Sequence, residues 1–318
     1  MQQDSDRPRI VFMGTPDFGV PALRALHAAG HLISLVVTQP DRPKGRGRKM
    51  VSSPIKAAAE SLGLPVFQPD SLSNAEAVDR ISAVSPAFIV VIAFGKILPK
   101  PVLDIPRYGA VNVHASLLPK YRGAAPIQWA MLNREKETGV TTMLMDEGLD
   151  TGDILLVSRT EIRKNETAST LHDRLSAMGA DLIVQTLRDL ASGIISPVAQ
   201  DPGKASYAPM LKKEDGRIAW QKSPEELEAF VRGMDPWPGA YTTMSGKRLR
   251  IFRLAPAERT ENQAPGTVIQ GFPDELRVAT GTGAVSILEV QGESGKRMPV
   301  AEFLRGKPVA AGTVLGKG

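Results

Sequence analysis

The chain has 318 residues, long enough for two domains, and its 42% hydrophobic and 23% charged residues and net charge of +5 are ordinary for a globular protein. It has no cysteine, which excludes disulfides, thiolate metal sites and a cysteine nucleophile. Residues 1–8 lack the apolar stretch of a signal peptide, and no run approaches the roughly 18 apolar residues of a membrane span, so we expect a cytoplasmic protein.

Apolar runs alternate with helical patterns through the first half of the chain. Strands are predicted, in order, at residues 10–13, 32–38, 65–67, 87–94, 109–114 and 140–145. Helices are predicted at residues 21–29, 54–62, 74–84 and 125–133, the third of them capped by Ser73. This alternation predicts an open, Rossmann-like, mostly parallel α/β sheet with right-handed crossovers.

The second half of the chain has a different pattern. A long amphipathic helix at 168–190 closes the first domain, and the Pro-, Gly- and Ser-rich stretch 194–209 is interpreted as a linker. Beyond a helix at 224–233 opened by Ser223, short strands follow at residues 241–244, 249–254, 266–269, 276–279 and 284–290. They predict a small OB-like β-barrel. The expected domains are therefore 1–193 and 210–318, joined by 194–209.

A strongly basic segment lies between Pro40 and Met50. It holds five basic residues against the single acid Asp41, and they are Arg42, Lys44, Arg46, Arg48 and Lys49. Gly45 and Gly47 make the segment flexible. Taken alone, such a charge run is typical of a solvated loop, but it equally suits a polyphosphate partner.

A catalytic site is predicted at the end of the strand 109–114, which carries Asn112 and His114. Two residues apart, their side chains point to the same face, and they lie at the carboxyl end of the strand, where open α/β sheets bind ligands. Asp150 follows the next strand and could reach His114 across the strand top. A metal is not expected, because a lone histidine lacks the companions that zinc requires.

Two other enzyme classes are disfavoured by missing motifs. The first turn, Gly14 to Gly19, lacks the G-x-G-x-x-G spacing of a dinucleotide-binding loop. No G-x-S-x-G elbow of a serine hydrolase is present. The Asn-x-His pair with a nearby carboxylate therefore remains the most informative pattern.

These motifs resemble the folate-dependent formyltransferases. The resemblance rests on Asn112-Val-His114, Ser116-Leu117-Leu118-Pro119 and Asp150-Thr-Gly, a core shared with glycinamide ribonucleotide transformylases and formyl-folate hydrolases. Features of the methionyl-tRNA formyltransferase branch are the stretches 12–18, 39–47, 122–129 and 236–239. The similarity extends from about Arg9 to beyond Ala301.

The resemblance implies both substrates. The donor would be 10-formyltetrahydrofolate, used as a co-substrate, and the acceptor the α-amino group of methionyl-initiator tRNA, for the initiation of translation. The amine attacks the formyl carbon directly, and charge collects on the formyl oxygen, where Asn112 and His114 would donate hydrogen bonds. Asp150 would orient and charge His114 or accept the amine proton through water; a local turn role beside Gly152 also stays open.

The resemblance also implies where the substrates bind. Ser116, Leu117, Leu118 and Pro119 would line the folate site, partly through backbone groups. Arg42, Lys44, Arg46, Arg48 and Lys49 would contact tRNA, and we expect a monomer. Two alternatives remain: the same transfer to a small amine, or tRNA binding without catalysis. From Lys204 onward, seventeen basic residues face thirteen acids, a net of about +4, which suggests an accessory RNA surface.

Overall fold

The computed structural model describes residues 8–44, 49–259, 262–269 and 274–317. It divides into two compact units, and the chain passes between them more than once. The first unit comprises Met1–Pro126, Glu137–Glu161 and His172–Ala208. The second comprises Ile127–Lys136, Ile162–Leu171 and Pro209–Gly318. Much of the segment expected to be a linker therefore clusters with the first unit.

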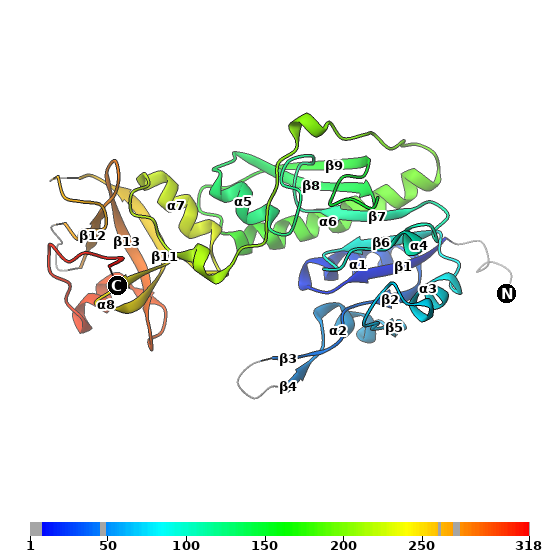
Figure 1. Cartoon of the computed structure of the whole chain (residues 1–318), viewed down its shortest axis with the longest axis horizontal. Coiled ribbons are helices and arrows are strands. Elements are labelled where there is room, and N and C mark those ends of the chain that lie inside the picture. The colour runs from blue at the N-terminus through cyan, green and yellow to red at the C-terminus, as the bar shows by residue number, and fades with distance from the viewer. Residues whose placement is uncertain (1–7, 45–48, 260–261, 270–273, 318) are drawn as a thin grey trace. The chain divides into compact units, whose positions relative to one another are not determined.

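The first unit is built on a seven-stranded sheet in the order β5-β2-β1-β6-β7-β8-β9 (Figure 1). Five parallel strands come first, namely β1 (Arg9–Gly14), β2 (Leu32–Val37), β5 (Val66–Phe67), β6 (Phe88–Ile92) and β7 (Ala110–His114). β8 (Glu137–Leu144) and β9 (Ile154–Glu161) are antiparallel, and β9 was not predicted. The expectation of a mostly parallel α/β sheet is confirmed.

Helices connect and cover these strands. They are η1 (Asp17–Gly19), α1 (Val20–Ala28), α2 (Pro54–Ser61), α3 (Ala75–Ser82), α4 (Lys100–Leu103) and most of α6 (Ala168–Ala191). After its first residue, α5 (Pro126–Leu132) belongs to the second unit. Asn74 caps α3 by accepting a hydrogen bond from the Ala77 amide at 2.9 Å. The predicted cap, Ser73, was wrong by one residue because serine and asparagine are both good caps and stand side by side here.

The central strands β1 and β6 carry the core of the first unit. Phe12 and Phe88 are among the largest fully buried side chains, and every residue of β6 is buried. A strand buried on both faces loses its polar–apolar alternation, which is why β6 is continuously apolar. The next strand, β7, is equally buried yet carries two polar residues, Asn112 and His114, near its carboxyl end.

The basic segment begins and ends as a hairpin. β3 (Arg42–Lys44) pairs with β4 (Lys49–Val51) in antiparallel register. At its base, Lys56 donates a hydrogen bond to Asp41 at 2.7 Å, and Gln68 donates another at 2.8 Å. The hydrogen bond from Lys56 and then that from Gln68 lower the pKa of the Asp41 carboxyl. The hairpin base is therefore tied to α2 and to the residue after β5.

The second unit contains an antiparallel sheet in the order β10-β11-β13-β12, with β14 beside β13. Its elements are η3 (Lys213–Gly216), α7 (Pro224–Gly233), β10 (Tyr241–Met244), β11 (Lys247–Ala257), β12 (Leu276–Ala279), β13 (Ala284–Gly292), β14 (Met298–Pro299) and α8 (Val300–Gly306). Backbone hydrogen bonds from Val268 to Thr313 at 2.7 Å and from Gly316 to Thr243 at 2.8 Å link the two edges. The predicted small β-barrel is confirmed.

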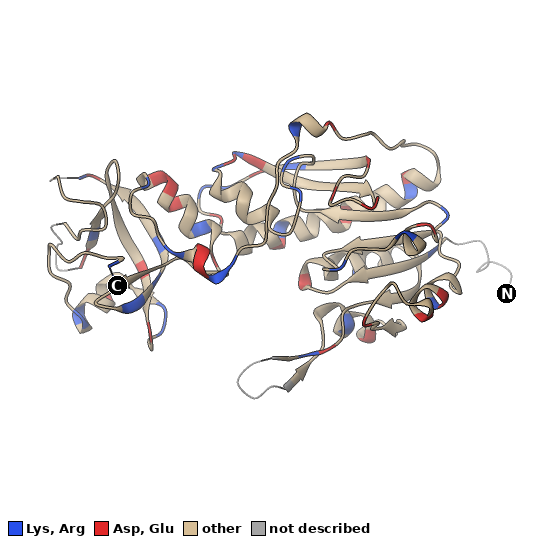
Figure 2. Ribbon diagram, viewed as in Figure 1, with Lys and Arg blue, Asp and Glu red and all other residues tan. Residues whose placement is uncertain are grey.

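Acidic and basic residues are interspersed along the ribbon of the second unit, as expected from its small charge excess (Figure 2). Within the described part of the chain, no helix is both long enough and apolar enough to cross a membrane.

Candidate active site

Strand β7 positions Asn112 and His114. It pairs with β6 on one side and with β8 on the other, so its backbone is fixed along both edges. Both side chains are buried, with exposed fractions of 8% and 6%. Because side chains alternate along a strand, the two share one face, as the sequence predicted.

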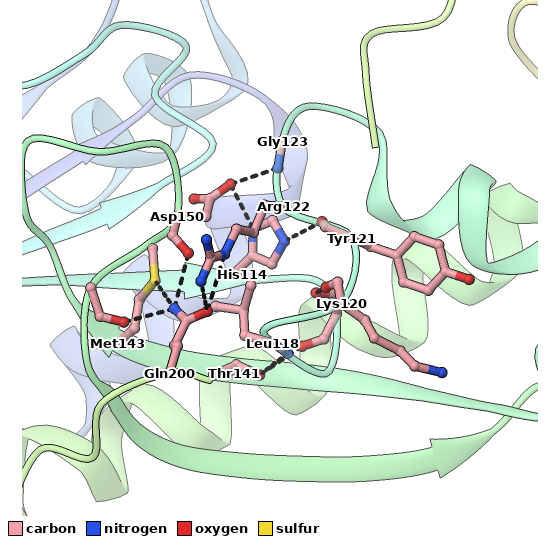
Figure 3. A network of polar contacts seen from close by, with 12 residues as sticks. His114, Leu118, Lys120, Tyr121, Arg122, Gly123, Thr141, Met143, Asp150 and Gln200 are labelled. Atoms are coloured by element: carbon pink, nitrogen blue, oxygen red, sulfur yellow. Dashed lines mark hydrogen bonds and ion pairs between the residues drawn. The ribbon is translucent and has the colours of Figure 1, made fainter. Parts of the chain in front are cut away.

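Both ring nitrogens of His114 face protein groups (Figure 3). Nε2 lies 2.9 Å from the carbonyl oxygen of Tyr121. A carbonyl oxygen only accepts, so Nε2 carries a hydrogen. Nδ1 lies 3.7 Å from Oδ2 of Asp150, within ion-pair range but too far for a direct hydrogen bond. Nδ1 is therefore the ring nitrogen that faces the carboxylate.

Asp150 reaches His114 by a route that the sequence did not predict. β8 runs antiparallel to β7, so Thr141 lies beside His114 and the strand ends with Leu144 paired to Val111. The loop between β8 and β9 must then return along the sheet by about three strand residues, or roughly 10 Å. Asp150 was expected to reach His114 across a strand top, and the two side chains do meet, but Asp150 is brought there by the loop that follows an antiparallel strand.

The return loop is tightly folded. A Cβ built on Gly152 would overlap the carbonyl oxygen of Leu144, so no side chain fits there. Asp150 itself has φ of +53°, an unusual backbone conformation for a residue other than glycine. The local turn is braced by Asp146, which accepts hydrogen bonds from the Gly148 amide at 3.0 Å and the Thr151 hydroxyl at 2.7 Å.

The Asp150 carboxylate points away from its own turn. Its Oδ2 accepts a hydrogen bond from the Gly123 amide at 2.7 Å, 27 residues earlier in the chain. Asp146, and not Asp150, makes the turn bonds of this loop. The geometry therefore directs Asp150 toward the neighbouring loop and His114.

Asn112 differs from His114 and Asp150 because its side-chain amide has no hydrogen-bond partner among the described residues. No described residue lies within hydrogen-bond distance of its side chain, although the side chain is buried. Its nitrogen and oxygen are nevertheless not among the side-chain atoms that are cut off from solvent without a hydrogen-bond partner, so the amide is accessible at the site. Such a group is suited to donate to a bound molecule.

The loop after β7 holds the residues predicted to bind folate. Ser116 is fully buried and donates to the Lys120 carbonyl at 2.6 Å, so its hydroxyl shapes the loop and does not face outward. Thr141 of β8 accepts from the Leu118 amide at 3.2 Å and donates to the Ser116 carbonyl at 2.7 Å. Leu118 is buried, Leu117 and Pro119 are partly exposed, and the Leu118–Pro119 peptide is cis.

Gln200 is a site residue that sequence reasoning missed. Its side-chain nitrogen donates to the carbonyl oxygens of Asp150 at 2.9 Å and Gly152 at 2.7 Å. Its side-chain oxygen accepts from Arg122 at 2.8 Å (Figure 3). Nothing in the sequence marks this glutamine, which lies in an irregular Pro- and Ser-rich stretch.

Comparison with known proteins identifies the family. Family models for formyl transferases match residues 8–187, and for their C-terminal domain residues 210–308. The methionyl-tRNA formyltransferase of Citrifermentans bemidjiense is 51% identical over 97% of this chain and 96% of its own length. That of Geobacter sulfurreducens is 50% identical over 97% of each chain. The chain belongs to the family of methionyl-tRNA formyltransferases.

Solved structures share the fold of this methionyl-tRNA formyltransferase family member at lower identity. An N-formyltransferase from Helicobacter canadensis, in complex with folinic acid and dTDP-3-aminofucose, is 16% identical, with a TM-score of 0.66 over 92% of this chain and 100% of that one. HypX from Aquifex aeolicus, in complex with tetrahydrofolic acid, is 19% identical, with a TM-score of 0.62 over 93% and 46%. The family expected from the sequence motifs is confirmed.

The residues predicted to contact tRNA are only partly described. Arg42 is exposed and donates to the side-chain oxygen of Gln39 at 2.9 Å. Lys44 and Lys49 form the last described backbone pair of the hairpin. Arg46 and Arg48 lie outside the described residues. Across the described chain, no three His, Cys, Asp or Glu side chains are grouped so that they could hold a metal ion.

Proposed function

We propose that this protein transfers the formyl group of 10-formyltetrahydrofolate to the α-amino group of methionine on initiator tRNA, for the initiation of translation. The observation that carries the proposal is the contact between His114 and Asp150, with Asn112 on the same strand as His114, in a chain about half identical, over nearly its whole length, to methionyl-tRNA formyltransferases. We further propose that it acts in the cytoplasm as a monomer.

The reaction exchanges one C–N bond for another. The acceptor amine forms a bond to the formyl carbon, the bond from that carbon to the folate nitrogen breaks, and the proton lost by the amine is balanced by one gained on the leaving nitrogen. Negative charge collects on the formyl oxygen on the way. Asn112 supports a role there, because its side-chain amide is accessible and has no hydrogen-bond partner among the described residues to give up.

His114 and Asp150 divide the remaining work in this proposal. Nε2 of His114 is engaged by the Tyr121 carbonyl, so Nδ1 is the nitrogen left to act. It lies 3.7 Å from Oδ2 of Asp150. At this separation the carboxylate can orient the ring or accept the proton that the acceptor amine loses. We propose that Asp150 holds the ring and takes part in moving the amine proton.

Folate would occupy the loop that follows β7. Leu117 and Pro119 are its partly exposed members, whereas Ser116 and Leu118 are buried and fix its path through Thr141. The site thus offers an apolar wall beside the unpaired Asn112 amide, which suits a pteridine-like ring and a polarised formyl oxygen.

The tRNA would be held by charge on two surfaces. The hairpin that begins at Arg42 and ends at Val51 carries the five basic residues predicted to contact the acceptor end. The barrel has mixed charge and a small basic excess, which suits nonspecific backbone contacts.

The test is a direct formylation assay. Purified protein is incubated with 10-formyltetrahydrofolate and methionylated initiator tRNA, and N-formylmethionine is measured after hydrolysis of the ester. Methionylated elongator tRNA, glycinamide ribonucleotide and a dTDP-amino sugar serve as competing acceptors. Formylation of a small amine in preference to the initiator tRNA would overturn the proposal.

A further inference from the structure

The segment 194–209 is packed against both loops of the active site. Val198 and Ile154 exchange backbone hydrogen bonds of 2.8 and 2.9 Å at the start of β9. Further along, Ser206 accepts from the Arg122 amide at 2.8 Å, and Ala208 donates to the Arg122 carbonyl at 2.7 Å. Gln200 lies between these two attachments and joins the two loops through its side chain.

The amide of Gln200 is matched at both ends. Its nitrogen carries two hydrogens, and these are directed to the carbonyl oxygens of Asp150 and Gly152. Its oxygen accepts from Nη2 of Arg122 at 2.8 Å and from Nε at 3.2 Å. The donors and acceptors around it therefore fix which way the amide points.

Arg122 explains why the oxygen end is held firmly. The residue is only 5% exposed, yet among the described residues no carboxylate lies within ion-pair distance of its guanidinium. The side-chain hydrogen bonds that it makes go to Gln200. A buried cation is costly without good acceptors, so the Arg122–Gln200 contact is one that the fold retains.

The nitrogen end meets a need of the return loop. Asp150 lies in the left-handed region, where a residue other than glycine persists only if its surroundings hold it there. The two carbonyls bound by Gln200 flank Thr151, so they fix the backbone from which the Asp150 carboxylate projects. The Gly123 amide then holds the carboxylate itself.

We propose that Gln200 is a positioning residue for catalysis, which holds Asp150 at His114 by linking its backbone to Arg122. The inference rests on the proposed formyl transfer. Gln200 touches neither His114 nor the Asp150 carboxylate in these contacts, so it acts through the loop. A displacement of about 1 Å in a reacting group typically costs about a hundredfold in rate.

Two substitutions separate the ends of the side chain. Gln200→Leu removes both contacts at similar volume, whereas Gln200→Glu keeps an acceptor for Arg122 but places oxygen atoms against two carbonyl oxygens. Each should lower kcat by about tenfold to a hundredfold and change KM for folate by less than about threefold. A Gln200→Glu enzyme with normal kcat would overturn the proposal.

Asp201→Ala is the matched control. Asp201 is the next residue, exposed, and its carboxylate bonds only within its own turn, to the Gly203 amide at 2.9 Å and to Lys204 at 3.2 Å. It should keep wild-type kcat. A loss as large as that of Gln200→Leu would show that the segment acts by general stability and would contradict a specific role for Gln200.

A double-mutant cycle with Asp150→Asn tests whether Gln200 acts through Asp150. In the Asp150→Asn background, Gln200→Leu should cause less than about a twofold further loss of kcat, since the group it positions is already disabled. Losses that multiply would place Gln200 on a separate route and overturn the inference.

A readout independent of activity separates this inference from the proposed function. The ring nitrogens of His114, assigned by their absence in His114→Ala, are followed by ¹⁵N nuclear magnetic resonance of the full chain. Gln200→Leu should shift the Nδ1 signal in the direction seen for Asp150→Asn, and Asp201→Ala should leave it unchanged. Unshifted His114 signals in Gln200→Leu would overturn the inference, whereas an inactive wild type with the expected shifts would refute only the formyl transfer.

Discussion

Strand β7 and the loop between β8 and β9 supply the same site but hold their side chains by different means. Asn112 and His114 lie on a strand that is paired on both sides, and their shared face can be predicted from the alternation of side chains along that strand. Asp150 sits on a loop in the left-handed region and depends on groups far along the chain, Gly123 and Gln200. The strand positions its side chains through regular backbone pairing, whereas this loop depends on a few specific hydrogen bonds.

The difference has consequences for tolerance to change. A side chain on β7 can be truncated without moving the backbone, because ladder hydrogen bonds do not involve it. The loop tolerates fewer changes. Gly152 has no room for a side chain, and the Asp146 carboxylate is needed to accept hydrogen bonds from Gly148 and Thr151. Substitutions on β7 should therefore remove chemistry alone, and those on the loop should also disturb geometry.

The largest effects are expected on β7. Asn112→Ala and His114→Ala should each lower kcat by about 10²–10³, the first by loss of an oxyanion donor and the second by loss of the ring that faces Asp150, with the melting temperature nearly unchanged. Asn74→Ala is a matched control, since it removes an asparagine that only caps α3. It should cost about 1 kcal/mol of stability and no activity. Near-normal turnover in Asn112→Ala would refute its role.

Asp150→Asn should follow, with a fall in kcat of about a hundredfold. Asparagine keeps an oxygen for the Gly123 amide, so the loop should survive while the charge facing His114 is lost. Turnover at saturating folate distinguishes a role of Asp150 in the chemical step from a role in folate binding. A rate restored by excess folate would make Asp150 a binding residue. Asp146→Asn in the same loop should retain its acceptor for Gly148 and stay active.

The comparison also shows what sequence reasoning reached. The face shared by Asn112 and His114 follows from a period of two, and the structure confirms it. Asp150 was expected near His114 and lies there, but the return loop that brings it was not predicted, because the direction of β8 depends on pairing that the sequence does not display. Gln200 carried no signal, since a glutamine in an irregular segment is distinguished only by partners 48 to 78 residues away.

Arg46 lies outside the described residues, and its role is predicted from the family resemblance. If its guanidinium stacks on or binds acceptor-stem bases, Arg46→Ala should weaken tRNA use by about 1–3 kcal/mol, roughly 5- to 150-fold in kcat/KM. Arg46→Lys should not restore it, because the planar fork is lost although the charge remains.

Salt dependence distinguishes this role from simple charge. Replacing Arg42 should flatten the logarithmic salt dependence of tRNA binding by about one unit if it neutralises a phosphate. A solvated loop predicts the opposite outcome, in which substitution of all five basic residues changes neither kcat/KM nor the slope.

The smallest effect is expected where structure is encoded most locally, at the start of α7. Ser223 accepts from the Glu226 amide at 3.2 Å, and Glu226 accepts from the Ser223 amide at 2.8 Å, a capping box written into four consecutive residues. The hydrogen bond from the Ser223 amide lowers the pKa of the Glu226 carboxyl below its ordinary 4.5. Glu226→Ala should therefore destabilise the helix start by about 1 kcal/mol at neutral pH.

The sign of the pH dependence follows from that lowered pKa. The contribution of Glu226 is fully present above pH 4.5 and is lost as the pH falls through the lower value of the folded state. Amide hydrogen exchange of α7, compared between wild type and Glu226→Ala, should show a gap in opening free energy at pH 6 that shrinks toward pH 3. Glu226→Gln keeps a neutral acceptor, so its difference from Glu226→Ala should not vary with pH. A gap that stays constant from pH 6 to pH 3 would mean that the carboxylate charge adds nothing to the cap. Turnover should be unchanged in both variants, because Glu226 is not among the residues of the site around His114.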